Sequence, residues 1–235
     1  MRTRRTVDAP TRITHWLLAL SFTGAWLTAG SELWRALHVT LGYTLAGLLA
    51  WRLVYGLVGP RPVRLATLWR RVSGLPGWWR DRLAAWRQGE GLRGAGRQAP
   101  HLAMGLALVG ILALIAPLVL SGYGTYQEWG AAWGDGEWLA EVHEFFGTAL
   151  LWAVLVHLAL ILGLSLQRRQ NQALPMLTGR QPGPGPDLVP HNRAGLAAVL
   201  LVMVLGFWSW QWQAYPHGLL PSADALASAA AEHDD

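Results

Sequence analysis

Five long blocks of this sequence are almost free of charge, and they limit what the chain can fold into more than any other feature. The blocks are Ile13–Ala29, Leu37–Val58, His101–Ser121, Phe145–Leu166 and Ala194–Trp212. Each has roughly the length of about 20 mainly apolar residues that a helix needs to cross a bilayer. The apolar residues run continuously, whereas the strands of a membrane barrel alternate between apolar and polar. The sequence therefore predicts an all-α integral membrane protein with five spanning helices.

The first block has a second interpretation. Arg2, Arg4 and Arg5 precede it and small residues end it, which is also typical of a cleaved signal peptide. The Arg4-Arg5 pair faintly resembles a twin-arginine signal. A retained helix is favoured, because His15 within the block belongs to the predicted site described below.

The composition is consistent with membrane-spanning helices when the apolar blocks and the segments that connect them are considered separately. Only 14% of the residues are charged, compared with about 25% in soluble domains. The mean hydropathy is nevertheless only +0.25, because the apolar blocks are averaged with arginine-rich connections. The chain has no cysteine, which excludes disulfides, thiolate zinc sites, iron–sulfur clusters and covalent c-type haem attachment.

The arginines predict the orientation of the chain. All 19 basic residues are arginine, and all but Arg35 lie before Ile13, from Arg52 to Arg97, or from Arg168 to Arg193. Five helices of alternating direction place these three regions on one side, which the positive-inside rule assigns to the cytoplasm. Most of the acidic residues fall on the other side. We therefore expect a bacterial inner-membrane protein with a cytoplasmic N-terminus and a periplasmic C-terminus, and the basic charge does not imply nucleic-acid binding.

The connections predict the domain organisation. Leu65–Arg87 directly follows Arg64, mixes four tryptophans with five arginines, and is interrupted at Gly74-Leu75-Pro76-Gly77. This pattern favours one or two short amphipathic helices in the lipid headgroup region, within an inner-face segment at about 60–99. We expect a core domain at 1–168, a cytoplasmic linker at 169–192 that includes Pro/Gly-rich Gln181–Pro186, a fifth helix at 193–213, and a poorly ordered periplasmic tail at 214–235.

The eight histidines fall into two groups. An interfacial, loop or tail position is expected for His101, His191, His217 and His233. The remaining four, in or at the edges of the predicted spans, are His15, His38, His143 and His157. An ionisable side chain at such a depth is costly and usually functional. For any single one of them, a structural hydrogen bond is an equally good explanation.

The spacing of these four histidines suggests two pairs. His143 and His157 are 14 residues apart, so on one helix they face nearly the same way and lie about 21 Å apart. His38 is near the outer start of the second span, and His15 is near the inner start of the first. Depth therefore pairs His38 with His143 and, with a rougher match, His15 with His157.

Two facing histidines at one depth, with no thiolate or carboxylate nearby, are typical of a bis-imidazole b-type haem between helices. Two such haems would form an electron conduit across the bilayer. Gly42 and Gly147 each follow a histidine by one helical turn, where a small residue lets a flat macrocycle lie close, although small residues are also common where membrane helices pack. Arg12 and Arg52 are expected to pair with haem propionates or to snorkel to the lipid headgroups.

A zinc or copper transporter is the competing use of buried histidines. Such a protein normally needs carboxylates, thiolates or methionines along its path. The interiors of the predicted spans contain neither aspartate nor glutamate, so haem is the favoured ligand.

Short motifs around the histidines resemble a known family. They are Arg12-Ile-Thr-His15-Trp16, His38-Val-Thr-Leu-Gly42-Tyr43, His143-Glu144 with Gly147 and His157, and more loosely Arg52-Leu53 and Pro117 with Gly122. Over roughly residues 8–168 the chain resembles the prokaryotic cytochrome b561 family of di-haem membrane cytochromes. That family is related to the cytochrome b subunits of nickel–iron hydrogenases and formate dehydrogenases.

The resemblance implies a function. It implies electron transfer in a respiratory chain between membrane quinone and a periplasmic c-type cytochrome or dehydrogenase, with the four histidines as axial ligands of two non-covalent b haems. The alternative is a haem-containing anchor subunit that docks such a partner, and the third hypothesis is the metal transporter. The Trp/Arg-rich segment and the fifth helix depart from the family pattern, and they leave open the partner, an oligomer, and whether the chain is the quinone-reactive subunit of an enzyme. No catalytic residue is predicted.

Overall fold

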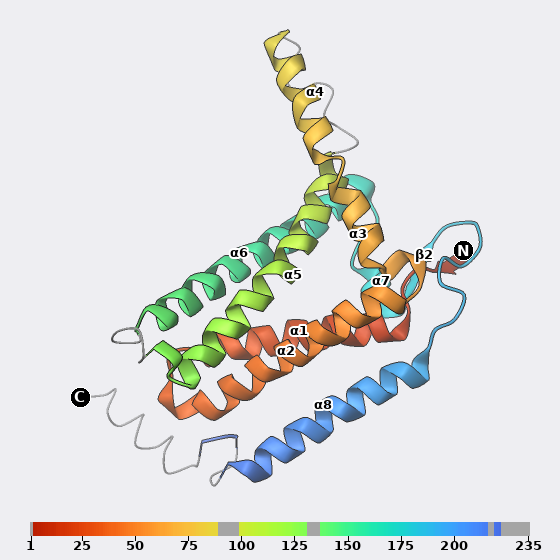
Figure 1. The fold of residues 1–235 in the computed structure, drawn as a ribbon. Helices are drawn as coiled ribbons and strands as arrows, with labels where there is room; N and C mark the ends of the chain where they lie inside the picture. The colour runs from red at the N-terminus through yellow and green to blue at the C-terminus, as the bar shows by residue number, and fades with distance from the viewer. Residues whose placement is uncertain (1, 89–98, 131–136, 216–218, 222–235) are drawn as a thin grey trace. The chain divides into compact units, whose positions relative to one another are not determined.

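The computed structural model describes residues 2–88, 99–130, 137–215 and 219–221 (Figure 1). The described part is mostly helical. Its elements are β1 (Thr3–Arg5), α1 (Ala9–Leu27), η1 (Glu32–Trp34), α2 (Arg35–Val58), η2 (Arg61–Val63), α3 (Leu65–Val72), α4 (Leu75–Arg87), α5 (Ala99–Tyr126), α6 (Glu137–Arg168), α7 (Leu174–Thr178), β2 (Arg180–Pro182) and α8 (Ala194–Ala214). The predicted tail lies largely outside the described residues.

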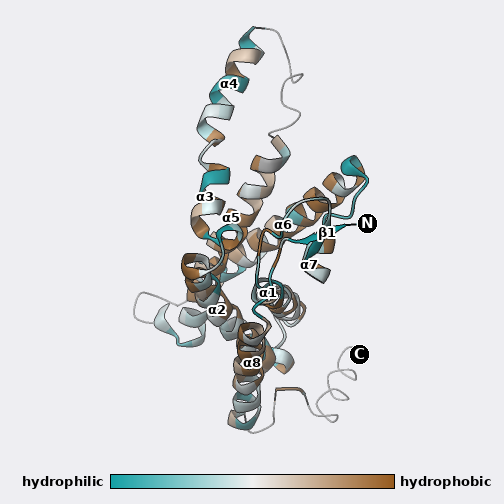
Figure 2. Cartoon of the chain, turned by 90° about the vertical axis from the view of Figure 1, so that its right-hand side faces the viewer, coloured by the Kyte–Doolittle hydropathy of each residue, from teal (hydrophilic) through white to brown (hydrophobic). Residues whose placement is uncertain are grey.

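Among the described residues, four segments are long and apolar enough to cross a membrane, by length and composition. They are Glu32–Val58, Leu102–Tyr126, Glu137–Arg168 and Ala194–Ala214. They correspond to the second, third, fourth and fifth predicted spans. Figure 2 shows that apolar residues cover most of α5, α6 and α8, whereas polar and apolar residues mix along α4.

The first predicted span forms helix α1, which is not among these four. Arg12, His15 and several hydroxyl residues lower its hydropathy below that of the other four predicted spans. The hydroxyls bond within their own helix: Thr14 Oγ1 donates to the Pro10 carbonyl at 2.8 Å, and Thr28 Oγ1 donates to the Gly24 carbonyl at 2.8 Å. Such local bonds let a helix carry hydroxyls in an apolar setting. The membrane crossing of α1 stays a prediction.

The chain divides into two compact units, of which the first comprises residues 1–7 and 49–191. Its core is the antiparallel pair α5 and α6, in which Gly124 faces Leu139 and Gly122 faces His143. Helix α3 packs on α5 where Gly105 faces Val72. One or two short helices were expected in Leu65–Arg87, and the structure has two, α3 and α4.

A two-stranded sheet in this first unit was not predicted. Strands β1 and β2 are antiparallel, with Thr3 opposite Pro182 and Arg5 opposite Arg180. The first two residues of the expected Pro/Gly linker at Gln181–Pro186 therefore belong to a strand. The pairing is reinforced by Asp187, whose carboxylate accepts from the Arg5 backbone N–H and lies 3.7 Å from the Arg5 guanidinium. Neither segment has the length or alternation by which strands are recognised in a sequence.

The second unit comprises residues 8–48 and 192–235, and polar contacts fasten α8 within it. Trp208 Nε1 donates to Thr44 Oγ1 at 2.8 Å, and the buried Gln211 Nε2 donates to Thr40 Oγ1 at 3.4 Å. Helix α8 also packs against α1. Hydrogen bonds of this kind join helices where no water competes for the polar groups.

The opposite end of α8 is fastened by a buried carboxylate. Asp8 is completely buried and caps α1 by accepting from the Thr11 backbone N–H at 3.3 Å. Its other oxygen lies 3.3 Å from Arg193 Nη1, just before α8 begins. The Asp8 side chain therefore caps the first turn of α1 and also binds the residue directly before α8.

We expect Asp8→Ala to lower the thermal unfolding midpoint of the protein in detergent. Loss of the cap alone costs about 0.5–2 kcal/mol, and the ion pair between Asp8 and Arg193 is also lost. Glu32→Ala is the matched control, because the Glu32 side chain is 84% exposed in its pair with Arg35, and exposed pairs contribute little. Equal midpoints for the two variants would contradict the role of Asp8.

Candidate cofactor site

His38 in the first turn of α2 is oriented by the end of α1. Its Nδ1 lies 2.8 Å from the backbone carbonyl oxygen of Ala25. A carbonyl oxygen only accepts, so Nδ1 carries the proton and the lone pair lies on Nε2. This hydrogen bond fixes both the tautomer and the direction of the ring, as second-shell partners do for metal-binding histidines.

His143 near the start of α6 is oriented in the same way by α5. Its Nδ1 lies 3.0 Å from the backbone carbonyl oxygen of Leu118, which again leaves the lone pair on Nε2. Gly122 lets the ring approach α5, because a Cβ atom there would lie 2.7 Å from His143 Cε1 and 2.8 Å from His143 Nδ1. Any larger residue at 122 would therefore displace the imidazole.

The two acceptors were missed by the sequence analysis. They are the main-chain carbonyls of Ala25 and Leu118, and every residue has such a carbonyl, so no side-chain pattern marks them. Gly122 was noted only as part of a loose resemblance. Gly122 and His143 are 21 residues apart in the sequence, so their contact becomes apparent only in the packed pair of α5 and α6.

His15 and His157 have different surroundings. His157 is half-buried in α6, and its Nδ1 is buried with no hydrogen-bond partner among the described residues. His15 is half-buried in α1, with its ring edge-on to Trp16 at a centroid distance of 5.5 Å. A buried, unpartnered imidazole nitrogen is costly, so His157 fits a site that a further group completes.

The residues around these histidines also suit a flat cofactor. Gly42 lies one turn after His38, and a Cβ atom built there would meet nothing within 4 Å. Gly147 holds the same position relative to His143 in α6.

His143 and His157 are 14 residues apart on the continuous helix α6, or about 21 Å, so they lie at different depths along it. Each predicted pair takes one histidine from each unit, and the pairing stays a prediction.

Comparison with protein families decides the class of the protein. The profile of the prokaryotic cytochrome b561 family matches residues 6–179, most of the chain. The chain belongs to the prokaryotic cytochrome b561 family. It is thus a membrane protein of a family that binds b-type haem and transfers electrons. No curated protein and no solved structure matches it.

The family match ends at the C-terminal end of α7. Helix α8 and strand β2 therefore lie outside the part shared with the cytochrome b561 family. The contacts of α8 with the shared part are nevertheless specific, since Trp208 and Gln211 donate to Thr44 and Thr40 of α2.

The two arginines predicted to pair with propionates lie at helix ends. Arg12 is half-buried in the first turn of α1. Arg52, near the end of α2, donates from Nη2 to the Val63 carbonyl at 3.1 Å, while its Nη1 is buried with no partner among the described residues. Gly56 makes room for that guanidinium, since a Cβ atom there would lie 2.8 Å from Nη1. The contact with Val63 was not predicted, and the propionate pairing stays a prediction.

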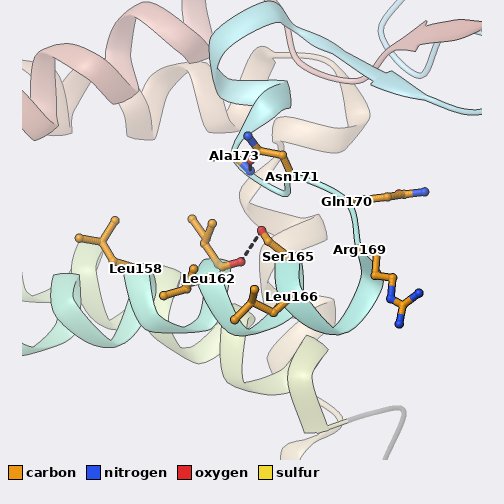
Figure 3. Close-up of a pocket in the computed structure, with 9 residues that line it drawn as sticks. Leu158, Leu162, Ser165, Leu166, Arg169, Gln170, Asn171 and Ala173 are labelled. Atoms are coloured by element: carbon orange, nitrogen blue, oxygen red, sulfur yellow. Dashed lines mark hydrogen bonds between the residues drawn. The ribbon is translucent and has the colours of Figure 1, made fainter.

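A groove of about 490 Å³ lies at the end of α6 (Figure 3). Leucines and Ile161 of α6 form its apolar wall, and residues of the following turn, including Gln170 and Asn171, give it a polar end. Ser165 Oγ donates to the Ile161 carbonyl at 2.7 Å, so this hydroxyl is used within the helix. The groove starts one residue after His157, but none of the predicted haem residues lines it.

We expect Gly122→Ala to disturb the haem held by His143. The added methyl group would push the imidazole away from α5 and weaken its bond to Leu118, which lowers haem content or shifts the reduced α-band and the ferric electron paramagnetic resonance signal. Overpacking of this kind costs about 1–3 kcal/mol. Gly110→Ala on the same helix is the control, because a Cβ atom there meets nothing within 4 Å. Identical spectra for both variants would remove Gly122 from the site.

Proposed function

We propose that this protein carries electrons across the bacterial inner membrane through two bis-histidine b haems, between membrane quinone and a periplasmic redox partner. The observation that supports this most is the pair of hydrogen bonds from His38 and His143 to backbone carbonyls. They orient two imidazoles from different helices with the lone pair on Nε2, as axial ligation requires.

The proposed roles of the residues follow from their positions. His38 and His143 hold one haem toward the periplasmic face, and His15 and His157 hold the other toward the cytoplasmic face. When bound, such a haem changes between its ferric and ferrous states one electron at a time and has no open coordination position. Gly42 and Gly147 give a macrocycle access to the helices.

Charged groups complete the proposed sites and the orientation. Arg52 Nη1 is placed to donate to a propionate, because burial without an acceptor is costly for a guanidinium, and Arg12 has the same role at α1. The arginine distribution supports a cytoplasmic N-terminus and, with α8 as a fifth span, a periplasmic C-terminus.

Replacing His157 by alanine tests the two-site arrangement. We expect the variant to lose one haem and retain the other, because the site of His38 and His143 is separate and its hydrogen bonds remain. The haem-to-protein ratio from a pyridine haemochrome assay is the measurement. His191→Ala, a loop substitution, serves as the control and keeps both haems. Retention of both haems by the His157 variant would refute the proposed ligand set.

Reduction by a quinol analogue tests the electron donor. We expect a quinol analogue to reduce both haems of the purified protein, as seen in the reduced-minus-oxidised absorbance spectrum. Dithionite is the control that reduces haem without a quinone site. Haems that dithionite reduces but no quinol does would favour the alternative of an anchor subunit for a periplasmic dehydrogenase or c-type cytochrome.

A further inference from the structure

Helix α4 has an apolar stripe that no described part of the chain covers. Trp79, Leu83 and Trp86 are 58%, 40% and 73% exposed. They are spaced at i, i+4 and i+7, which places them within about 60° of one another around a helix. An exposed stripe of two tryptophans and a leucine marks a surface that another molecule covers.

Arginines flank this stripe on both sides. At 100° per residue, Arg80 and Arg87 lie on one side of it and Arg82 on the other, while Asp81 lies on the opposite face. Arg80 and Arg87 are exposed. The stripe is therefore apolar along its centre and positive along both edges, and the one acidic residue of α4 points away.

The position of α4 in the chain brings it to a membrane surface. It lies between α2 and α5, which are both long and apolar enough to span, so the connection stays on one side of the bilayer. Helix α3, directly before α4, packs near the beginning of α5, where a Cβ atom at Gly105 would lie 3.1 Å from Val72 Cγ1. After only Ser73 and Gly74, α4 begins beside this helix end.

We infer that α4 is a docking surface for anionic phospholipid headgroups of the bilayer that the protein itself spans. Tryptophans sit at the headgroup level, and flanking arginines bind lipid phosphates. The cytoplasmic leaflet is negatively charged and attracts each nearby arginine by about 1 kcal/mol, or about fivefold in binding. This inference does not depend on haem or on quinone.

The absence of cysteine from the chain allows a clean test by spin labelling. A nitroxide is attached to Leu83→Cys in the stripe or, as the matched control, to Asp81→Cys on the opposite face. Each full-length protein is reconstituted into vesicles of phosphatidylcholine alone or of phosphatidylcholine mixed with phosphatidylglycerol. Collision rates with oxygen, which concentrates in the bilayer, and with a water-soluble nickel chelate report the depth of each label.

We expect the label at 83, but not at 81, to be accessible to oxygen and protected from nickel, and more so in vesicles with phosphatidylglycerol. Arg80→Gln with Arg87→Gln should weaken the docked state about 30-fold, whereas Arg80→Lys with Arg87→Lys should preserve it. Haem content shows that each variant is folded. Three results would each overturn the inference. The label at 83 could be accessible to nickel, or its insertion could be independent of phosphatidylglycerol. The label could also be equally protected in detergent, which would indicate a protein partner.

Discussion

The hydrogen bond from a histidine Nδ1 to a main-chain carbonyl of a neighbouring helix is the interaction on which the proposed site depends. An imidazole in a membrane can rotate, and either nitrogen can carry the proton. The bonds from His38 to Ala25 and from His143 to Leu118 remove both freedoms. They use carbonyls that lie within helices, so the orienting groups are part of the scaffold itself. Gly122 shows how close the packing is that makes one of these bonds possible.

The cost of polar groups in an apolar setting explains other features. Hydroxyls of α1 bond to carbonyls of their own helix, and α8 is joined to α2 through Trp208 and Gln211. The buried Asp8 is used both as a helix cap and as the partner of Arg193. Within the described part of the chain, His157 Nδ1 and Arg52 Nη1 bear this cost, because they are buried without a hydrogen-bond partner. Where α4 instead exposes apolar side chains, the bilayer surface is the inferred cover.

Much of the helical architecture could be predicted because long apolar blocks have few other solutions. All five blocks are helices, and four of them meet the criterion for a membrane span. Helix α1 does not meet this criterion because of its polar residues, and the predicted ligand His15 is one of them. The pairing of β1 with β2 could not be predicted, since strands of three residues leave no pattern. The family was confirmed, whereas the choice of four histidines by depth and spacing stays a prediction. The backbone carbonyls that accept from His38 and His143 could not be predicted, because the role of a carbonyl depends on which helices lie side by side.

The central claim is that histidines alone hold two b haems in this chain. Near-infrared magnetic circular dichroism of the oxidised protein identifies the axial ligands of haem iron, and haem quantification on the same sample gives the number of haems per chain. The account predicts two low-spin haems per chain, each with two histidine ligands. A single haem, a high-spin haem, or an axial ligand other than histidine would contradict it.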